Sequence, residues 1–392
     1  MKDIVIVDAL RTPIGRFRGS LAGVRADHLG ALVIGKLLER VDLSPAQVDD
    51  VIFGCVTQIG EQSANIARTA LLGAGWPVTI PGLTIDRKCG SGEVAVHLAA
   101  GAIAAGSADI VVAGGAENMS RVPMGSNREI HGEAFGWMVA ERYELTSQGE
   151  AAERMADKWS LSRDELDDYA FASHSRAAAA ADAGHFANEI VEVPVETLRE
   201  HGLSEPVAPL RGDETIRRDT SREKLSTLKT SFRPETTGRI TAGNSSQISD
   251  GAAALLLMSA ETAGRLGLKA RARIRAFTTV GSDPTLMLTG PIAATYKVLE
   301  KAGLGIDDID LFEVNEAFAS VPLAWMCETG VSHERLNVNG GAIALGHPLG
   351  ASGARLMTTL LNELERRGAR YGLQAICCAG GMGTATIIER LD

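Results

Sequence analysis

The chain of 392 residues is 45% hydrophobic and 4% aromatic, contains 43 glycines, and carries a formal net charge of −10. This length favours two packed halves over a single core, and the acidic balance argues against a general nucleic-acid binder. No run of about 18 apolar residues is present that would predict a membrane span.

Apolar runs alternate with helical patterns in the first third of the chain. Strands are predicted at 3–9, 48–56, 82–86 and 108–116, and helices near 27–41, 64–74 and 90–106. The strands are apolar on both faces and separated by helices. This arrangement indicates a mostly parallel sheet with helices on both sides.

The last third repeats the scheme. Strand patterns occur at 271–281, 307–316, 336–341 and 373–381, and helical patterns at 290–303, after residue 316, and near 350–367. Some segments of the two thirds are similar in sequence: "VDDVIFGCV" (48–56) resembles "IDDIDLFEV" (306–314), and "DIVVAGGAE" (109–117) resembles "QAICCAGGM" (374–382). Self-similarity at a separation of about 260 residues indicates a duplicated α/β unit rather than a short-period repeat.

The middle of the chain, from about 118 to 240, is more polar. It contains one clear helical pattern, in which Ser162 and Glu165 form a capping box and Gly184 is a stop signal. Residues 211–239 hold eight Lys or Arg against five acids. This excess of positive charge is typical of a solvated loop or of a site for an anionic ligand such as a nucleotide phosphate.

One cysteine lies where chemistry is plausible. In "DRKCGSG" (86–92), Cys89 falls on a turn between a predicted strand and a predicted helix. The free N–H groups and positive dipole of a helix N-terminus would lower the thiol pKa toward neutrality. A lone cysteine is more often a small buried residue, and the odd total of five predicts free thiols in a reducing, cytoplasmic compartment.

Two further polar residues lie in turns. His347 lies between Gly346 and Pro348 in the glycine-rich stretch "NVNGGAIALGHPLGASGAR" (337–355), where a constrained turn suits a general base. Asn315 in "EVNEAFA" (313–319) lies where a strand meets a helix and could be a simple cap. The spacing of His, Cys and carboxylate residues matches no structural metal site, so no metal is predicted.

These motifs together resemble the thiolase family, the acetyl-CoA acetyltransferases and 3-ketoacyl-CoA thiolases, from "ALRTPIGRFRGSLAG" to "ATIIERL". The resemblance implies that Cys89 is a nucleophile that becomes an acyl thioester and that His347 takes its proton. It also implies that Asn315 holds a water in a first oxyanion site. The N–H groups of Cys89 and of Ala379, two residues past the C-terminal cysteine, would form a second.

The C-terminal cysteine, the acid/base of the family, is one of the pair in "AICCAGGMGTA" (375–385). The family pattern has small residues at every second position after it. Counting from Cys377 meets small residues, Ala379, Gly381, Gly383 and Ala385, whereas counting from Cys378 meets Met382 and two threonines. Because side chains alternate along a strand, Cys377 is predicted to be the acid/base and Cys378 to face away into packing.

The resemblance also implies that coenzyme A and acyl-CoA are substrates, with no permanently bound cofactor. Arg217 corresponds to an adenine contact, and the pantetheine channel would be lined by Ala242, Ser246, Ile248, Phe232 and Phe318. Two positions depart from the family. Lys224 replaces a coenzyme-contacting serine, and Ser147-Gln148-Gly149 replaces the His-Met-Gly of acetoacetyl-specific members. The second change favours a longer or bulkier acyl group.

The resemblance implies two βαβαβαββ halves in five αβαβα layers, 1–117 plus 241–268 and 269–392, with an inserted loop domain at 118–240. It implies ping-pong thiolysis of 3-oxoacyl-CoA in fatty acid β-oxidation by a homodimer or homotetramer, or alternatively condensation of two acetyl-CoA. A decarboxylating ketoacyl-synthase relative would have a second histidine in place of the second cysteine. A non-catalytic lipid carrier would lack Cys89 or the NEAFA and GHP motifs, which this chain keeps.

Overall fold

The structure, a computed structural model, describes residues 3–128, 131–199 and 208–392. Within these ranges the strands form one ten-stranded sheet in the order β4-β3-β5-β6-β1-β7-β10-β9-β8, with β2 paired to β6. The strands are β1 Ile4–Arg11, β2 Gly15–Arg16, β3 Asp50–Gly54, β4 Gly82–Ile85, β5 Ile110–Asn118, β6 Ser249–Ser259, β7 Ala272–Gly281, β8 Leu311–Val314, β9 Tyr371–Cys378 and β10 Met382–Arg390.

The helices pack on both faces of this sheet. They are α1 Ala26–Arg40, α2 Ile66–Gly73, α3 Ser91–Ala105, α4 Trp137–Ala140, α5 Gln148–Lys158, α6 Arg163–Asp182, α7 Val195–Leu198, α8 Arg222–Ser226, α9 Ala260–Leu266, α10 Gly290–Ala302, α11 Ser320–Thr329, α12 Ala342–Leu345 and α13 Leu349–Arg367. No helix of the described residues is both long and apolar enough to cross a bilayer.

The duplicated unit predicted from the sequence is confirmed. The first half runs β1-α1-β3-α2-β4-α3-β5-β6, and the second runs β7-α10-β8-α11-α13-β9-β10. On either side of the β1–β7 pair, which joins Val5 to Arg273 and Ile6 to Ala272, the order β1-β6-β5-β3 corresponds to β7-β10-β9-β8, and β4 has no counterpart among the described strands of the second half. The two halves therefore join edge to edge through their first strands.

The prediction of a mostly parallel sheet is wrong. Among the described strands the parallel pairs are β3–β4, β3–β5 and β8–β9, and the other pairs are antiparallel. Each half closes with two antiparallel strands, β5–β6 and β9–β10. Helices cover both faces there too, so these strands are as apolar as parallel ones and the sequence pattern does not distinguish them.

The strand pattern at 336–341 is also wrong. This segment makes a single bridge, between Leu336 and Phe312. Asn337 and Gly340 adopt positive φ angles of 47° and 76°, which interrupt an extended strand. Asn337 instead accepts a hydrogen bond from the Val314 N–H and donates one to its carbonyl, at 2.9 and 2.8 Å.

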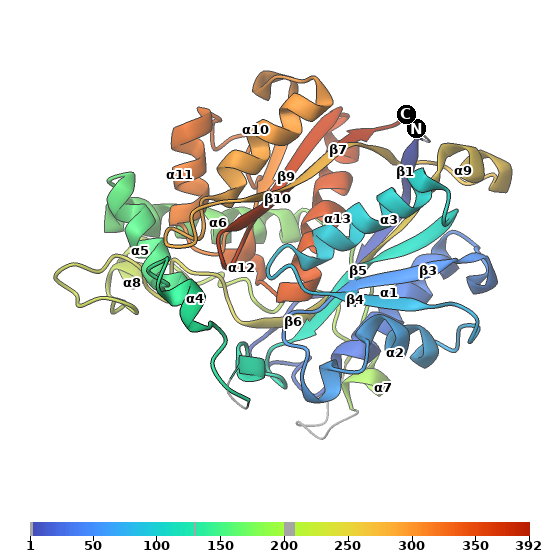
Figure 1. Ribbon diagram of the computed structural model, residues 1–392, viewed down its shortest axis with the longest axis horizontal. Coiled ribbons are helices and arrows are strands. Elements are labelled where there is room, and N and C mark those ends of the chain that lie inside the picture. Colours follow the sequence, from blue (N-terminus) through green and yellow to red (C-terminus); the bar gives the residue numbers. More distant parts are fainter. Residues whose placement is uncertain (1–2, 129–130, 200–207) are drawn as a thin grey trace.

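The helices divide the core into layers. Val33 of α1 belongs to an apolar cluster on one outer side, and Val298 of α10 belongs to a cluster on the other. Ala99 of α3 and Met357 of α13 share a third cluster with strand residues of both halves. Figure 1 shows α3 and α13 between β3, β4 and β5 on one side and β7, β9 and β10 on the other. The five αβαβα layers follow from this arrangement.

Glycines bring the two central helices together at their N-termini. A Cβ added to Gly353 of α13 would lie 2.1 Å from the backbone N of Glu93 in α3, and one added to Gly92 would lie 2.7 Å from the Gly350 carbonyl O. Real Cβ atoms do not come this close, so larger residues would force the helices apart. Because Cys89 precedes α3 and His347 precedes α13, this crossing brings both residues to one place.

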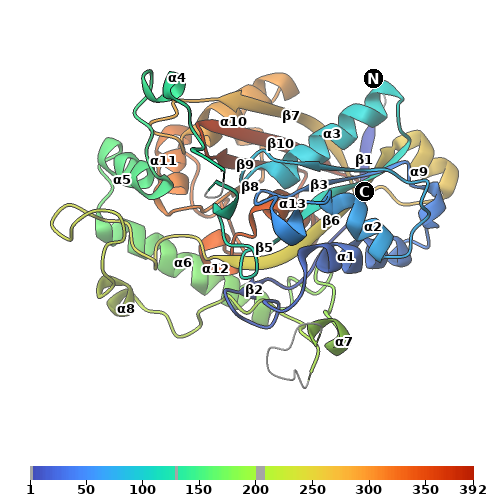
Figure 2. The ribbon, with the colours of Figure 1, turned by 60° about the horizontal axis from the view of Figure 1, so that its bottom comes forward.

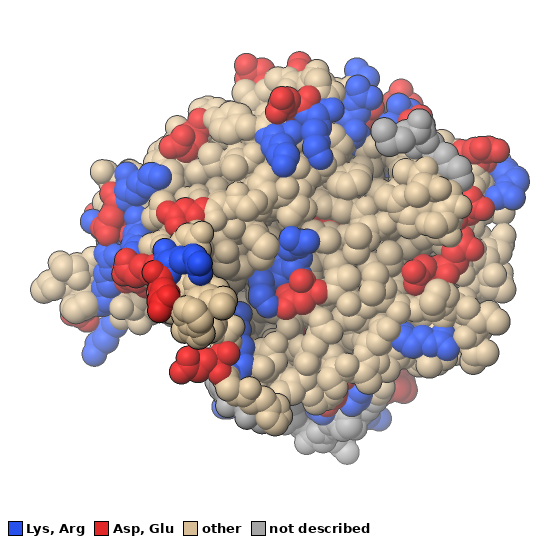
Figure 3. Space-filling model, in the orientation of Figure 1, with Lys and Arg blue, Asp and Glu red and all other residues tan. Residues whose placement is uncertain are grey.

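The middle segment supplies helices α4 to α8. The predicted capping box of α6 is confirmed, since the Ser162 side chain accepts from the Glu165 N–H and Glu165 accepts from the Ser162 N–H. The helix ends at Asp182, and Gly184 has a positive φ of 72°. Figure 2 shows α5, α6 and α8 together at the end of the sheet opposite α9. In Figure 3, basic and acidic side chains are intermixed over the face shown.

A buried polar cluster ties α3 to β10. Glu93 is fully buried, and its carboxylate accepts hydrogen bonds from the hydroxyls of Thr384 and Thr386. His97, one turn later on α3, has its Nε2 3.8 Å from that carboxylate and 2.8 Å from the Thr386 Oγ1. Burial raises the pKa of Glu93 from 4.5 to about 7, although the hydroxyl donors oppose this.

We expect Glu93→Gln to change the pH dependence of stability. Between pH 4.5 and 7 the folded wild-type protein holds a proton that the unfolded chain releases, so its free energy of unfolding falls as pH rises. At about 1.4 kcal/mol per tenfold change in proton affinity, the loss is roughly 3 kcal/mol. The variant does not lose this stability as pH rises. The difference in Tm, variant minus wild type, should therefore increase from pH 5 to pH 8. A pH-independent difference would show that Glu93 is ionised throughout this range.

Candidate active site

Cys89 lies in the turn between β4 and α3, as the sequence indicates. Lys88, immediately before it, has a positive φ of 51°, and Gly90 is the N-cap of α3. This sharp reversal directs the Cys89 side chain into the interior, where it is 5% exposed. Cys89 and His347 line the same pocket. The structure thus brings together two residues 258 positions apart in the printed sequence.

His347 is held by two serines that sequence reasoning missed. Its backbone N–H donates to the Ser249 hydroxyl at 2.7 Å, and its Nδ1 lies 2.6 Å from the Ser352 Oγ. The Ser352 hydroxyl donates to the Pro348 carbonyl at 2.8 Å, so it accepts from Nδ1–H. This arrangement puts the ring's lone pair on Nε2, which faces the Asn315 amide. The sequence signal that could have revealed Ser352 is a serine five residues after the histidine of the GHP motif.

Asn315 lies beside that lone pair. Its Nδ2 is 3.3 Å from His347 Nε2, and the side chain is 1% exposed. The Oδ1 atom of Asn315 has no hydrogen-bond partner among the described protein atoms. Burial, assisted by the charge of Arg355, lowers the pKa of His347 to about 3. The imidazole is therefore neutral near pH 7, with its basic nitrogen available to accept a proton.

The expectation of a lowered Cys89 pKa is wrong for this state of the protein. Burial raises the pKa of the thiol to about 11, even though the backbone N–H groups of Ala379 and of Cys89 itself point to the sulfur and oppose the shift. The loss of water around a buried thiolate outweighs two N–H donors and one helix end. The thiol consequently stays protonated until a base removes its proton.

The cysteine pair lies at the end of β9, with its side chains on opposite faces. Cys377 belongs to the apolar cluster that contains Phe318 and Ala379. Cys378 lies against Gly90, where an added Cβ would come within 2.7 Å of its sulfur. Both thiols are fully buried, and burial together with the nearby Cys89 raises the pKa of each. The alternation is confirmed, and the acid/base role of Cys377 stays a prediction.

Two pockets meet at Cys89. We call the first the serine pocket; it has a volume of about 160 Å³ and is lined by Cys89, Met119, Met124, Gln148, Phe232, Ser245, Ser246, Gln247, Ile248, Leu288, Ala317, Phe318, His347 and Leu349. The second, the large pocket, has a volume of about 610 Å³ and is lined by Val56, Thr57, Lys88, Cys89, Met124, Gly125, Asn127, Arg128, Phe135, Thr146, Ser147, Gln148, Gly149, Phe232, Met287, Phe318, Leu349, Ala379, Gly380 and Met382.

Several residues predicted to contact the coenzyme lie in these pockets. Ser246 and Ile248 line the serine pocket, and the rings of Phe232 and Phe318 meet edge to face, 6.0 Å apart, at the boundary of both. Ala379 lines the large pocket. Gly381 is not among the described residues that line the large pocket, because its backbone lies against Pro284. The neighbouring Gly380 does line this pocket.

Three predicted coenzyme residues lie elsewhere. Arg217, Lys224 and Ala242 line neither pocket within the described part of the chain. The Lys224 ammonium is 2.8 Å from the Asp219 carboxylate. Six of the eight cations at 211–239 are in ion pairs; no ion pair of Arg217 or Lys229 is present among the described residues. Most of this cluster is thus a neutralised surface, and Arg217 and Lys229 are its cations most available to an anionic ligand.

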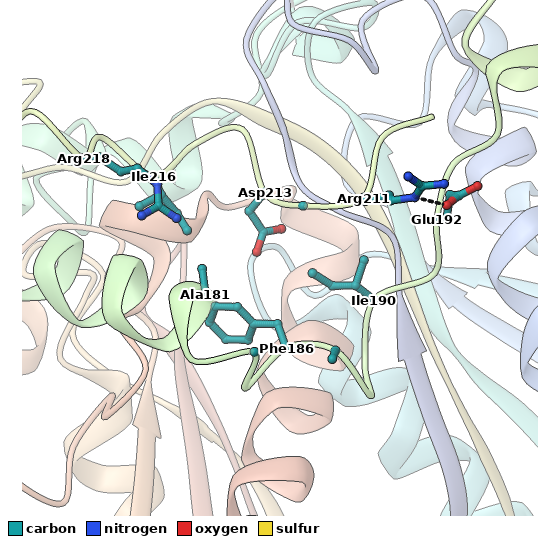
Figure 4. Close-up of a pocket in the computed structure, with 11 residues that line it drawn as sticks. Ala181, Phe186, Ile190, Glu192, Arg211, Asp213, Ile216 and Arg218 are labelled. Carbon is teal, nitrogen blue, oxygen red and sulfur yellow. Dashed lines mark hydrogen bonds and ion pairs between the residues drawn. The ribbon is translucent and has the colours of Figure 1, made fainter. Parts of the chain in front are cut away.

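A third pocket, of about 500 Å³, lies beyond the end of α6 (Figure 4). Phe186 and Ile190 form its apolar part, and Arg211 and Glu192 form an ion pair at one end. The Asp213 carboxylate is occupied by the buried Arg11 guanidinium, at 2.7 and 2.9 Å. With these charges paired and no nucleophile among its described lining residues, we assign no chemistry to this pocket.

Glu117 is a further buried residue that the sequence pattern did not single out. Its carboxylate accepts from the backbone N–H groups of Val56, Thr57 and Gly350, at 2.8 to 2.9 Å. It therefore fixes the loop after β3 to the first turn of α13, next to His347. An acid that ends an otherwise apolar strand, as in "IVVAGGAEN" (110–118), is the signal that could have revealed it.

Comparison with known proteins gives a consistent result. Residues 4–261 match the family "Thiolase, N-terminal domain", and residues 268–390 match "Thiolase, C-terminal domain". The steroid 3-ketoacyl-CoA thiolase FadA6 of Mycobacterium tuberculosis is 48% identical over all of this chain and 95% of its own length. The beta-ketoadipyl-CoA thiolase of Acinetobacter baylyi is 45% identical over the full length of both. The crystal structure of the Bacillus anthracis acetyl-CoA acetyltransferase is 39% identical, with a TM-score of 0.89, and covers 100% of this chain and 99% of that one.

Proposed function

The chain belongs to the thiolase family of acyltransferases, and from this premise we propose that it works in the direction of thiolytic cleavage of 3-oxoacyl-CoA. Cleavage is the favoured direction because condensation of two acetyl-CoA is uphill unless its product is removed. The large pocket, of about 610 Å³ around Cys89, supports an acyl group longer than acetyl. Gln148, in place of the methionine of acetoacetyl-specific members, lines that pocket.

One observation carries the mechanism: the Cys89 thiol lies in one pocket with His347, beneath the N–H of Ala379. His347 Nε2 takes the thiol proton, and the thiolate adds to the 3-oxo carbon of the substrate. The N–H groups of Cys89 and Ala379 stabilise one oxyanion, and His347, together with a water held by Asn315, stabilises the other. The C2–C3 bond breaks, and Cys377 gives a proton to C2, which releases acetyl-CoA.

The second half-reaction regenerates the thiol. Coenzyme A enters along the serine pocket, where Ser246, Ile248 and the two phenylalanines lie. Cys377, which has lost its proton, takes the proton of the coenzyme A thiol, and the sulfur attacks the acyl-Cys89 thioester. Cys89 leaves as a thiolate that protonated His347 reprotonates, and the shortened acyl-CoA leaves. Because both half-reactions use one thiol, ping-pong kinetics are expected.

The chain-length test is a panel of 3-oxoacyl-CoA substrates. We expect kcat/KM for thiolysis to be at least about tenfold higher with 3-oxooctanoyl-CoA than with acetoacetyl-CoA, since a longer chain fills more of the large pocket. Steady-state rates at fixed coenzyme A measure this ratio. A preference for acetoacetyl-CoA, together with rapid condensation of acetyl-CoA, would favour the acetyl-CoA acetyltransferase function instead.

We further infer a degradative, β-oxidation-type role in the cytoplasm, as a homodimer or homotetramer. The buried free thiols Cys55, Cys89, Cys377 and Cys378 support a reducing compartment. The edge strand β4, with Leu83 43% exposed, supports association of subunits. Light scattering of the purified protein would determine the number of subunits.

A further inference from the structure

His347 follows a helical turn that is too short to hold its own shape. α12 spans only Ala342–Leu345, and Gly346 alone separates it from His347. So short a helix leaves most of its backbone N–H and C=O groups without helical partners and is unstable by itself. The chain then reverses at Gly346, which has a positive φ of 85°. The place of His347 therefore depends on what holds the two ends of α12.

The N-terminal end of α12 is held by Glu316, the residue after Asn315. Its carboxylate is fully buried and accepts a hydrogen bond from the Ile343 N–H at 3.0 Å. It also accepts from the hydroxyls of Ser173 and Tyr169, both on α6, at 2.7 and 3.0 Å. Figures 1 and 2 show α12 beside α6. This end of α12 is thus fixed to α6 and to the turn that carries Asn315.

The C-terminal end of α12 is held by the side-chain amide of Gln247. Its Nε2 lies 2.9 Å from the Ile343 carbonyl O and 3.3 Å from the Ala344 carbonyl O, and 2.8 Å from the Thr215 carbonyl O. All three partners are acceptors, so the nitrogen of the amide, and not its oxygen, faces them. With two N–H groups, the amide binds Thr215 with one and shares the other between the two carbonyls of α12.

This amide joins the inserted segment to the catalytic histidine. Thr215 belongs to the inserted segment, whereas α12 leads directly to His347. The backbone carbonyl of Gln247 also accepts from the His347 N–H, at 3.2 Å. A general base acts only within hydrogen-bond reach of the proton that it removes, so a small displacement of the imidazole slows the reaction strongly.

We propose that Gln247 is a positioning residue for His347: its side-chain amide fixes the end of α12 and thereby places the imidazole beside the Cys89 thiol. The inference rests on the proposed roles of Cys89 and His347 and deepens them by naming a residue that acts through the histidine. Without the amide, three carbonyls lose their donor and side-chain hydrogen bonds hold α12 only at the Glu316 end.

The test measures how fast acetyl-CoA acetylates Cys89, by rapid quenching and intact-mass spectrometry, in the wild type and in Gln247→Met. Methionine has a similar length and no N–H donor. We expect the rate to fall by about 10- to 100-fold, because a displacement of about 1 Å at the reacting groups costs this much. In steady-state thiolysis, kcat should fall while the KM values for 3-oxoacyl-CoA and coenzyme A stay nearly unchanged. Gln247→Ala, which introduces no bulk, should show the same loss.

The matched control is Gln58→Met. Gln58 is half-buried like Gln247, and its Nε2 donates to the Cys55 carbonyl at 2.9 Å, but it is not among the described residues that line the serine pocket or the large pocket. This variant should keep the wild-type rate even if its Tm falls. His347→Gln, which removes the base, gives the rate expected for complete loss of the histidine.

Three results overturn the proposal. One is acetylation of the Gln247 variants at the wild-type rate, and another is an equal loss of rate in Gln58→Met. The third is a higher KM for coenzyme A with kcat unchanged, because that result makes Gln247 a coenzyme contact. If instead His347→Gln is acetylated as fast as the wild type, the proposed function of His347 itself fails.

Discussion

Cys89→Ala is expected to lower kcat/KM for thiolysis by about 10⁴-fold or more, because the variant has no thiol to form the acyl thioester that links the two half-reactions. His347 and the N–H groups of Cys89 and Ala379 remain in the variant, so binding of the substrate should be largely preserved. Steady-state rates with acetoacetyl-CoA and 3-oxodecanoyl-CoA measure the loss. Intact-mass spectrometry after incubation with acetyl-CoA should show an acetyl adduct on the wild-type protein and none on the variant.

The matched control is Cys327→Ala. Cys327 is a free cysteine on the exposed side of α11 and lines neither pocket within the described chain. This variant should retain full activity and form the same acetyl adduct as the wild type. Full thiolysis by Cys89→Ala would contradict the covalent mechanism and would return the lipid-carrier alternative to consideration.

Cys377→Ser is expected to abolish turnover while leaving acyl transfer onto Cys89 measurable. A serine hydroxyl is a much weaker acid than a thiol, so the proton exchange at the α-carbon would fall by about 10³-fold or more. Transfer of an acetyl group from acetyl-CoA to Cys89 needs His347 and not Cys377. The expected signature is therefore an acetyl adduct by mass spectrometry together with loss of both thiolysis and condensation.

Cys378→Ser serves as the neighbour control. Cys378 packs against Gly90 at the start of α3, so a buried hydroxyl there should cost stability, about 1 kcal/mol, with little effect on kcat. Chemical denaturation and steady-state rates separate the two effects. If Cys378→Ser abolished turnover and Cys377→Ser did not, the choice between the two thiols would be reversed.

Local signals in the sequence were enough to predict the position of many helices and strands. The capping box at Ser162 and Glu165 fixes the start of α6, and the strand patterns at 3–9 and 108–116 match β1 and β5 within two residues. These features depend on hydrogen bonds and side-chain periodicity within a few residues. Strands β6 and β10 were not predicted as strands, although both are buried along most of their length, because small and apolar residues such as those of "DGAAALLLM" (250–258) fit a helix as readily.

Strand direction and the state of the catalytic thiol required the fold. Whether β6 runs parallel or antiparallel to β1 depends on the path of the 130 residues between β5 and β6 (119–248), about which local periodicity contains no information. The helix N-terminus near Cys89 suggested a lowered pKa, but the degree of burial, which no local pattern gives, reversed the direction.

The sequence by itself determined the duplicated α/β architecture, the family, and the motifs that hold Cys89, Asn315, His347 and Cys377. These depend on residue type and order, which are read directly from the chain. The tertiary structure decided the meeting of α3 and α13 at glycines, the Ser352 bond that puts the His347 lone pair on Nε2, and the burial of Cys89 in one pocket with His347. Each of these depends on distances between atoms far apart in sequence, and packing alone sets those distances.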